Sequence, residues 1–196
     1  MSHDFKFQLN WSSRDPLIFD KSRVLDELKR TIRDVNNFPK AGIVFKDVTP
    51  VLLDSKLLAQ AVQLMAEPYN DARITRVVAI ESRGFLFGAP VAVQLGAGLV
   101  PIRKPGKLPA ATQRIEYALE YGTDALEMHH DAVQAGDRVL VVDDVLATGG
   151  TANAAAQLVS GTGAAVVGFS FLLELDFLNG RARLQGRRVE ALLHYA

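Results

Sequence analysis

The segment of residues 139–151, VLVVDDVLATGGT, restricts the possible folds of this chain more than any other. It begins with four apolar residues, which indicate a buried strand, and a glycine-containing turn separates that strand from a helix expected over residues 150–160. A strand that is apolar on both faces is typical of a parallel sheet, because helices then cover both sides of the sheet. The segment therefore predicts an α/β fold.

The rest of the chain repeats this pattern. Apolar runs predict strands at residues 76–80, 98–102, 138–143 and 164–173, and apolar residues at helical spacing predict helices at residues 22–36 and 84–95 and a third that begins after Asp54. Residues 37–50 carry two prolines and one glycine, which favours a loop. Strands that alternate with helices predict a central, mostly parallel sheet flanked by helices.

The alternation lapses between residues 104 and 131. There the stretch RIEYALEYG is followed by DALEMHH, a pattern that predicts a β-hairpin with Gly122 in its turn. A flap of this kind beside an α/β site is typical of a lid that closes over a ligand. We therefore expect residues 103–122 to form a flexible lid loop.

The composition indicates one hydrophobic core and no strong charge bias. With 196 residues, 48% of them hydrophobic, the chain has the size of one domain, expected over residues 1–196 with an irregular N-terminal lead over residues 1–21. Basic and acidic residues balance at 22 each, which argues against a nucleic-acid partner or a polybasic membrane contact. The sequence has no cysteine, no apolar run of the roughly 18 residues that a membrane helix needs and no secretory signal pattern, so we expect a cytoplasmic protein.

The end of the strand at residues 139–142 carries groups suited to a phosphate and a diol. Asp143 and Asp144 stand where open α/β sheets bind ligands, and ionised carboxylates accept hydrogen bonds from neighbouring ribose hydroxyls. The turn that follows can wrap backbone N–H groups around a phosphate at the start of a helix. This predicted phosphate loop consists of Ala147, Thr148, Gly149, Gly150 and Thr151. The alternative is an ordinary turn and helix cap beside two solvated aspartates.

At this point the chain resembles a known family. VVDDVLATGGT is similar to the signature with which type I phosphoribosyltransferases hold phosphoribosyl pyrophosphate (PRPP). Three further segments resemble the adenine-specific branch: FPKAGIVFKDVTPVL from Phe38, ESRGFLFGAPVA from Glu81, and IRKPGKLPAAT through EYALEYG over residues 102–122. The resemblance implies the type I phosphoribosyltransferase fold, a homodimer, and transfer of the phosphoribosyl group to adenine to form AMP and pyrophosphate. It also implies Mg2+, held by ligand oxygens and water near Asp143 and Asp144 rather than by direct protein bonds.

The resemblance further implies roles for individual residues. Arg83 is implied to be catalytic because it meets the leaving group, with an unusual cis peptide in the tripeptide that it ends. Glu120 is implied to exchange the proton on the purine ring nitrogen, and Tyr121 to help close the lid. The residues implied to meet pyrophosphate are Glu81, Ser82, Arg83, Arg103, Lys104 and Lys107. Those implied to border adenine are Val44, Phe45 and Lys46.

Several of these roles have alternatives. Phe45 also suits a core position, and Lys46 stands where members of the family often carry arginine, whose planar fork lysine lacks. Glu116 competes with Glu120 for the proton transfer. His129 and His130 are adjacent on a predicted strand and so point to opposite faces, which favours packing or surface roles over joint metal binding.

Two other functions are alternatives to an adenine-specific enzyme. A sensor of PRPP that regulates transcription would use the same fold, but it needs a DNA-binding module, and only about 20 residues precede the first predicted helix without a helix-turn-helix pattern. An enzyme for hypoxanthine, guanine or xanthine would keep the reaction and change the base. Those 6-oxopurine enzymes typically lack the LEYG motif found here.

Overall fold

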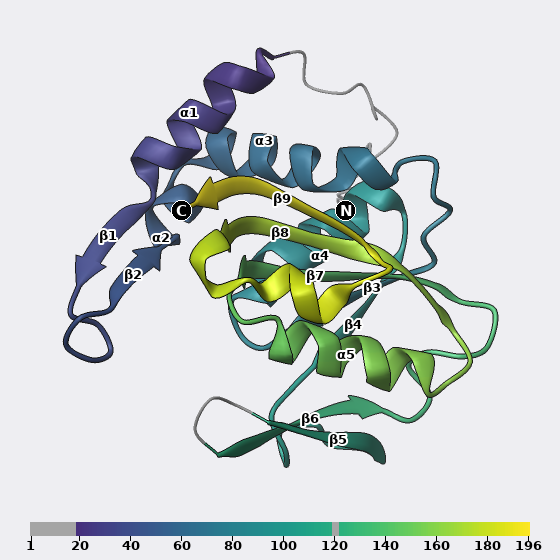
Figure 1. Ribbon diagram of the computed structural model, residues 1–196. Helices are drawn as coiled ribbons and strands as arrows, with labels where there is room; N and C mark the ends of the chain where they lie inside the picture. The colour runs from purple at the N-terminus through teal and green to yellow at the C-terminus, as the bar shows by residue number, and fades with distance from the viewer. Residues whose placement is uncertain (1–18, 119–121) are drawn as a thin grey trace, which may run out of the picture.

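Five parallel strands form the central sheet, in the order β4-β3-β7-β8-β9 (Figure 1). The structure is a computed structural model that describes residues 19–118 and 122–196. All four neighbouring pairs in the sheet run parallel, which confirms the predicted α/β class. The strands are β3 (Arg76–Ile80), β4 (Gly98–Ile102), β7 (Arg138–Leu146), β8 (Ala165–Leu175) and β9 (Arg188–Tyr195).

Helices cover both faces of this sheet, as the apolar character of β7 predicts. Leu140 and Val142 contribute to the hydrophobic cluster on one face, whereas Val139 and Val141 contribute to the cluster on the other, because side chains alternate along a strand. The first face is covered by α1 (Lys21–Thr31), α2 (Thr49–Leu53), α3 (Ser55–Ala66) and α4 (Gly84–Leu95). The second is covered by α5 (Gly150–Ser160), seen below the sheet in Figure 1. Three short 3-10 helices are η1 (Glu67–Tyr69), η2 (Asp176–Leu178) and η3 (Gly180–Leu184).

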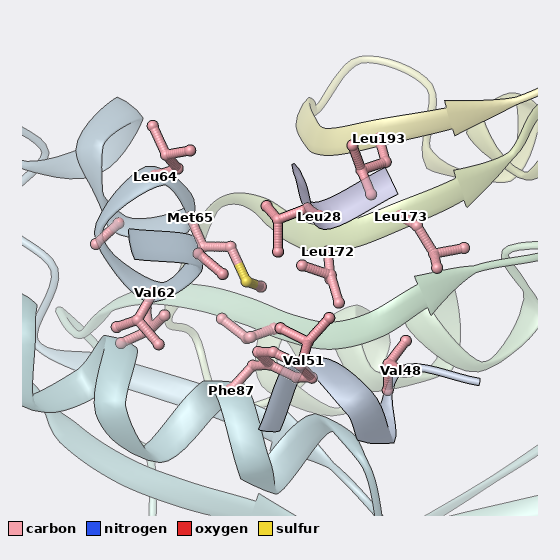
Figure 2. Close-up of a cluster of buried hydrophobic side chains, with 14 of the residues drawn as sticks. Leu28, Val48, Val51, Val62, Leu64, Met65, Phe87, Leu172, Leu173 and Leu193 are labelled. Atoms are coloured by element: carbon pink, nitrogen blue, oxygen red, sulfur yellow. The ribbon is translucent and has the colours of Figure 1, made fainter. Parts of the chain in front are cut away.

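The first cluster ties four helices to the sheet (Figure 2). Leu28 of α1, Val51 of α2, Met65 of α3, Phe87 of α4 and Leu172 of β8 are all fully buried in it. Burying side chains of this size contributes about 1.5–3 kcal/mol each relative to leaving them exposed. Since Phe87 belongs to the first turn of α4, this packing also fixes the segment that joins β3 to α4.

The predicted helix over residues 22–36 was too long. The helix α1 ends at Thr31, and β1 (Arg33–Asn36) follows it and pairs antiparallel with β2 (Val44–Asp47), which lies inside the predicted loop over residues 37–50. The N-cap is Asp20, whose carboxylate accepts hydrogen bonds from two backbone N–H groups of the first turn. The error arises because residues 33–36 pair with residues 44–47, and local helical spacing does not reveal such pairing. An Arg33–Asp47 ion pair at 3.1 Å accompanies it.

The remaining elements agree closely with the prediction or extend it. The N-cap at Asp54 is confirmed by its carboxylate, which accepts hydrogen bonds from the first N–H groups of α3. The strands β5 (Thr112–Ala118) and β6 (Thr123–His129) pair antiparallel, and Gly122 before β6 has a φ of 90°. β5 falls inside the predicted lid loop, so part of that loop is regular strand. β9 was not predicted, although Gly186, with a φ of 76°, lies in the turn just before it.

No helix in the described part of the chain combines the length and apolar character needed to cross a membrane.

Candidate active site

Eight of the sequence-predicted site residues line a cleft of about 240 Å3 at the carboxyl ends of β3 and β7. This is the edge at which open α/β sheets bind ligands, because loops from neighbouring parallel strands meet there. The cleft is lined by Ile80, Glu81, Ser82, Arg83, Lys104, Leu126, Asp143, Asp144, Val145, Ala147 and Thr151. The structure thus brings together the predicted pyrophosphate segment, the aspartate pair and part of the phosphate loop.

The phosphate loop is shaped by close backbone contacts with η3. Gly149 caps α5 with a φ of 77°, a conformation that side chains other than glycine rarely adopt. A Cβ atom on Gly149 would lie 2.3 Å from the carbonyl oxygen of Gly180, and one on Gly180 would lie 2.1 Å from that of Ala147. The loop encloses a smaller cavity of about 80 Å3 in front of α5. Glycine is therefore required on both sides of this contact.

Asp143 and Asp144 form a closely coupled carboxylate pair. Asp144 is buried, and its backbone N–H donates to Oδ1 of Asp143 over 2.9 Å. Burial and the neighbouring Asp144 carboxylate raise the pKa of Asp143 well above its usual value. Burial also raises the pKa of Asp144, against the opposing charge of Arg83. A cation or hydroxyl donor that enters the cleft would therefore stabilise the ionised form of this pair.

Arg83 lies between this pair and Phe45. Its Nε lies 2.9 Å from Oδ2 of Asp144, within ion-pair distance but without the alignment of a hydrogen bond. Its guanidinium lies 4.8 Å from the centre of the Phe45 ring. A cis peptide was expected in the tripeptide that ends at Arg83, and the bond between Glu81 and Ser82 is cis.

The loop after β4, called here the cationic loop, consists of residues 103–107 and folds around Glu81. The Glu81 carboxylate accepts a hydrogen bond from Nε of Arg103 at 3.2 Å, one from the backbone N–H of Lys104 at 3.0 Å, and a third from Nζ of Lys107. Although burial raises the pKa of Glu81, these hydrogen bonds and the lysine and arginine charges lower it overall. Glu81 is therefore ionised and offsets part of the positive charge of the loop.

A second contact joins the cationic loop to the hairpin and the phosphate loop. Nζ of Lys104 donates to the Asp124 carboxylate. The Tyr117 hydroxyl donates to that carboxylate at 3.2 Å and lies 3.3 Å from Oγ1 of Thr151. Tyr117 and Asp124 were not predicted as site residues. They lie directly opposite each other in the β5–β6 pairing, so the register of the hairpin is the signal that would have found them.

Arg183 on η3 was also not predicted. One of its terminal nitrogens, Nη1, lies 3.5 Å from the position that a Cβ atom on Gly150 would take. Within the described residues, its guanidinium forms no hydrogen bond or ion pair. A free cation therefore lies at the rim of the phosphate loop, and only the tertiary contact of Gly180 with that loop brings it there.

The residues predicted to border adenine differ in what their side chains contact. Phe45 is half-buried outside both hydrophobic clusters and meets the Phe38 ring edge-on at 5.1 Å, so the core alternative for Phe45 is wrong. Lys46 does not line the cleft. Its Nζ pairs with Oδ1 of Asp34 at 2.6 Å and lies 4.1 Å from the centre of the Tyr195 ring. Val44 exposes 47% of its surface.

Two of the predicted residues, Glu120 and Tyr121, lie outside the described part of the chain. Glu116, the alternative to Glu120, is exposed, pairs with Arg114 at 2.8 Å and does not line the cleft. His129 is half-buried on β6 and His130 is exposed, and neither belongs to a cluster of possible metal ligands among the described residues.

The comparison with known proteins first gives the class. Residues 51–186 match the family model of the phosphoribosyl transferase domain, which agrees with a parallel sheet that carries a phosphate loop and an acidic pair after one strand. The fold and the site are those of a phosphoribosyltransferase.

Individual relatives then give the branch. The chain is 55% identical over 180 residues to an adenine phosphoribosyltransferase of Myxococcus xanthus (strain DK1622), an alignment that covers 92% of this chain and 97% of the relative. The crystal structure of adenine phosphoribosyltransferase from Rhodothermus marinus is 51% identical, with a TM-score of 0.86 over 89% of this chain and 99% of that one. The Saccharomyces cerevisiae enzyme, solved with an iminoaltritol bisphosphate and adenine, is 39% identical, with a TM-score of 0.83 over 88% and 99%. The chain belongs to the adenine phosphoribosyltransferase family.

Proposed function

We propose that the protein transfers the 5-phosphoribosyl group of PRPP to adenine, with AMP and pyrophosphate as products. The observation that carries this proposal is the cleft, in which a phosphate loop, a buried carboxylate pair and a group of cations meet. The chain that forms this cleft is similar to adenine-specific enzymes. The identity to adenine-specific enzymes also argues against a transcriptional sensor or a 6-oxopurine enzyme. The reaction salvages free adenine as a nucleotide.

The phosphate loop would hold the 5-phosphate. Backbone N–H groups around Gly149 and at the start of α5 face the smaller cavity, and the positive end of the helix favours an anion there. Thr148 and Thr151 add hydroxyl donors. Asp143 and Asp144 would accept hydrogen bonds from the two ribose hydroxyls, which fixes the sugar with its anomeric carbon toward the middle of the cleft.

The cations on the opposite wall would stabilise the leaving pyrophosphate. As the bond to the anomeric carbon breaks, negative charge accumulates on pyrophosphate, and fixed positive groups stabilise that charge more than they stabilise the ground state. Ser82 and Arg83 reach this space from the end of β3, and Lys104 from the cationic loop. Arg103 and Lys107 would join them when their contact with Glu81 is broken.

The acidic pair fits a magnesium ion. Oδ2 of Asp144 is buried without an aligned hydrogen bond among the described residues, and the charge of Asp144 raises the pKa of Asp143, so the pair has unused capacity for positive charge. We propose that Asp143 and Asp144 hold Mg2+ through water while ligand oxygens bind it directly, as suits an ion that loses water reluctantly. The ion would supply charge neutralisation to the pyrophosphate.

The β1–β2 hairpin would border the base. The Phe45 ring and the Arg83 guanidinium form a flat apolar and cationic surface for the purine, and the Val44 backbone would meet its edge. Lys46, with its side chain between Asp34 and Tyr195, would position β2 rather than touch the ring. Glu120 would exchange the proton of the ring nitrogen, and Tyr121 would help residues 103–122 close over the site.

We also propose a homodimer that uses the outer face of α4. Leu86 and Val93 lie seven residues apart on this helix and expose 46% and 54% of their surfaces, and Leu99 on the neighbouring edge strand exposes 43%. Apolar residues clustered on one face mark an interaction surface. We place the reaction in the cytoplasm, because a multiply charged donor such as PRPP does not cross a bilayer unaided.

One assay tests the main proposal. Purified protein is incubated with Mg2+, PRPP and one purine at a time, and the nucleotide product is measured. AMP formation with adenine, together with little product from hypoxanthine, guanine or xanthine, is the expected result. The absence of AMP at high enzyme concentration, while PRPP still binds, would mean that the protein is a sensor.

A further inference from the structure

Glu81 is the one anion among the residues predicted to meet pyrophosphate. Its side chain is only 9% exposed, and it lines the cleft beside Arg83 and Lys104. Pyrophosphate carries several negative charges at neutral pH, so an ionised carboxylate at the same place repels it. A direct binding role for Glu81 therefore conflicts with its charge.

The partners of Glu81 indicate a different role. Three donors of the cationic loop converge on its carboxylate, two of them from the charged side chains of Arg103 and Lys107. Further bonds close the loop, since Nη1 of Arg103 donates to the Lys107 carbonyl at 3.1 Å and the Gly106 N–H donates to Glu127 at 3.0 Å. The carboxylate thus stands at the centre of a folded cationic loop.

The other cations of the cleft wall are paired in the same manner. Arg83 faces Asp144 at 2.9 Å, and Lys104 contacts Asp124. Among the described residues, each cation proposed to meet pyrophosphate has an acidic partner inside or beside the cleft. The protein's own acids thus suffice to hold the cationic loop beside the site, and each cation must be shared with an acid when a ligand binds.

We propose that Glu81 is a positioning residue that holds Arg103 and Lys107 at the cleft in place of pyrophosphate and competes with pyrophosphate for them. This inference rests on the proposed function. The competition weakens pyrophosphate binding, and so it speeds release of the product after each transfer. The same contact keeps the loop cations ready for the next PRPP.

The test is the affinity of the Glu81→Gln variant for pyrophosphate with Mg2+, measured by titration calorimetry. Glutamine keeps the shape and can still accept the Lys104 N–H, but it no longer holds Lys107 by charge. We expect the dissociation constant of pyrophosphate to fall about tenfold, within the range of about 5- to 150-fold typical of coupling between sites. In the forward reaction, kcat and the KM for PRPP should both fall, while the KM for adenine stays constant.

Glu67→Gln is the matched control. It removes the same charge from the protein, but Glu67 is exposed, lies outside the cleft and has Lys21 at 3.4 Å as its partner. Its pyrophosphate affinity should equal that of the wild type, and the gain of Glu81→Gln should shrink as salt is added. A similar gain in both variants would reduce the effect to net charge and overturn the inference.

Equal or weaker pyrophosphate binding by Glu81→Gln would also overturn it, because a purely structural Glu81 predicts that result. If Glu81→Gln unfolds at a lower temperature, the affinity is compared again in a Lys107→Gln background, where the competition predicts that the Glu81 substitution loses most of its effect. A wild-type protein that neither binds pyrophosphate nor forms AMP would instead refute the proposed function.

Discussion

Replacing Gly149 with alanine should damage both the stability of the protein and its hold on the 5-phosphate. A residue with a Cβ atom at a φ of 77° is strained by about 1–2 kcal/mol. The new Cβ would also lie 2.3 Å from the Gly180 carbonyl oxygen, which is backbone and cannot rotate away. Forcing an extra methyl into a packed contact adds about 1–3 kcal/mol, so the free energy of unfolding should fall by about 2–5 kcal/mol.

Thermal unfolding measures this loss. For a chain of this size, 1 kcal/mol corresponds to about 2–4 °C in Tm, so the variant should melt roughly 4–20 °C lower. Gly161→Ala at the other end of α5 is the control, because Gly161 has a φ of −61° and the nearest atoms to a Cβ there lie at 3.4 Å. It should be neutral or slightly stabilising. The KM for PRPP should rise only in Gly149→Ala.

The contact between Gly149 and Gly180 is the basis of this prediction. An unchanged Tm and KM in Gly149→Ala would refute it, since the loop would then tolerate a side chain where the structure leaves no room. An equal loss in Gly161→Ala would mean that a side chain at either cap of α5 is harmful, and that the loop contact has no special importance.

Three further substitutions test the site. Asp143→Asn should raise the Tm of the ligand-free protein at pH 7, because burial and Asp144 raise the pKa of Asp143 in the fold, so ionising it costs stability as pH rises above the unfolded value of about 4. Melting curves across pH check this, and a gain that persists at pH 3 would contradict it. Arg183→Gln should raise the KM for PRPP about three- to tenfold and leave the KM for adenine unchanged, as expected for one exposed charge on a phosphate. Steady-state kinetics with equal PRPP constants would exclude Arg183 from the phosphate site. Phe45→Leu should raise the KM for adenine about fivefold through loss of stacking worth about 1 kcal/mol, with the KM for PRPP as the internal control.

Local signals predicted the parts of the fold that the chain specifies locally. The apolar run of β7 and the glycines after it defined the phosphate loop, and Asp54 marked the start of α3 by its capping chemistry. These features depend on residues within one turn or one strand of each other. Local signals were therefore sufficient to find the cleft edge and the aspartate pair. Glu81, Arg83 and Lys104, which also line the cleft, were predicted from the family resemblance.

What the sequence did not reveal depends on contacts between distant segments. The pairing of β1 with β2 overrode helical spacing at Val35, and Arg183 reaches the phosphate loop only because Gly180 packs on Ala147. Tyr117 required the hairpin register, which depends on a turn rather than on residue type. The partners of Lys46 lie on β1 and at the end of β9, far apart along the chain.

The contact between the phosphate loop and η3 also determines when the enzyme becomes competent during its own synthesis. The ribosome makes the loop first, and then α5 and β8, before it reaches the segment whose backbone supports the loop. A nascent chain that stops after β8 has the complete binding motif but lacks the surface against which Gly149 is shaped. Activity should therefore appear only as the last part of the chain is completed, and a prematurely terminated product would not consume PRPP.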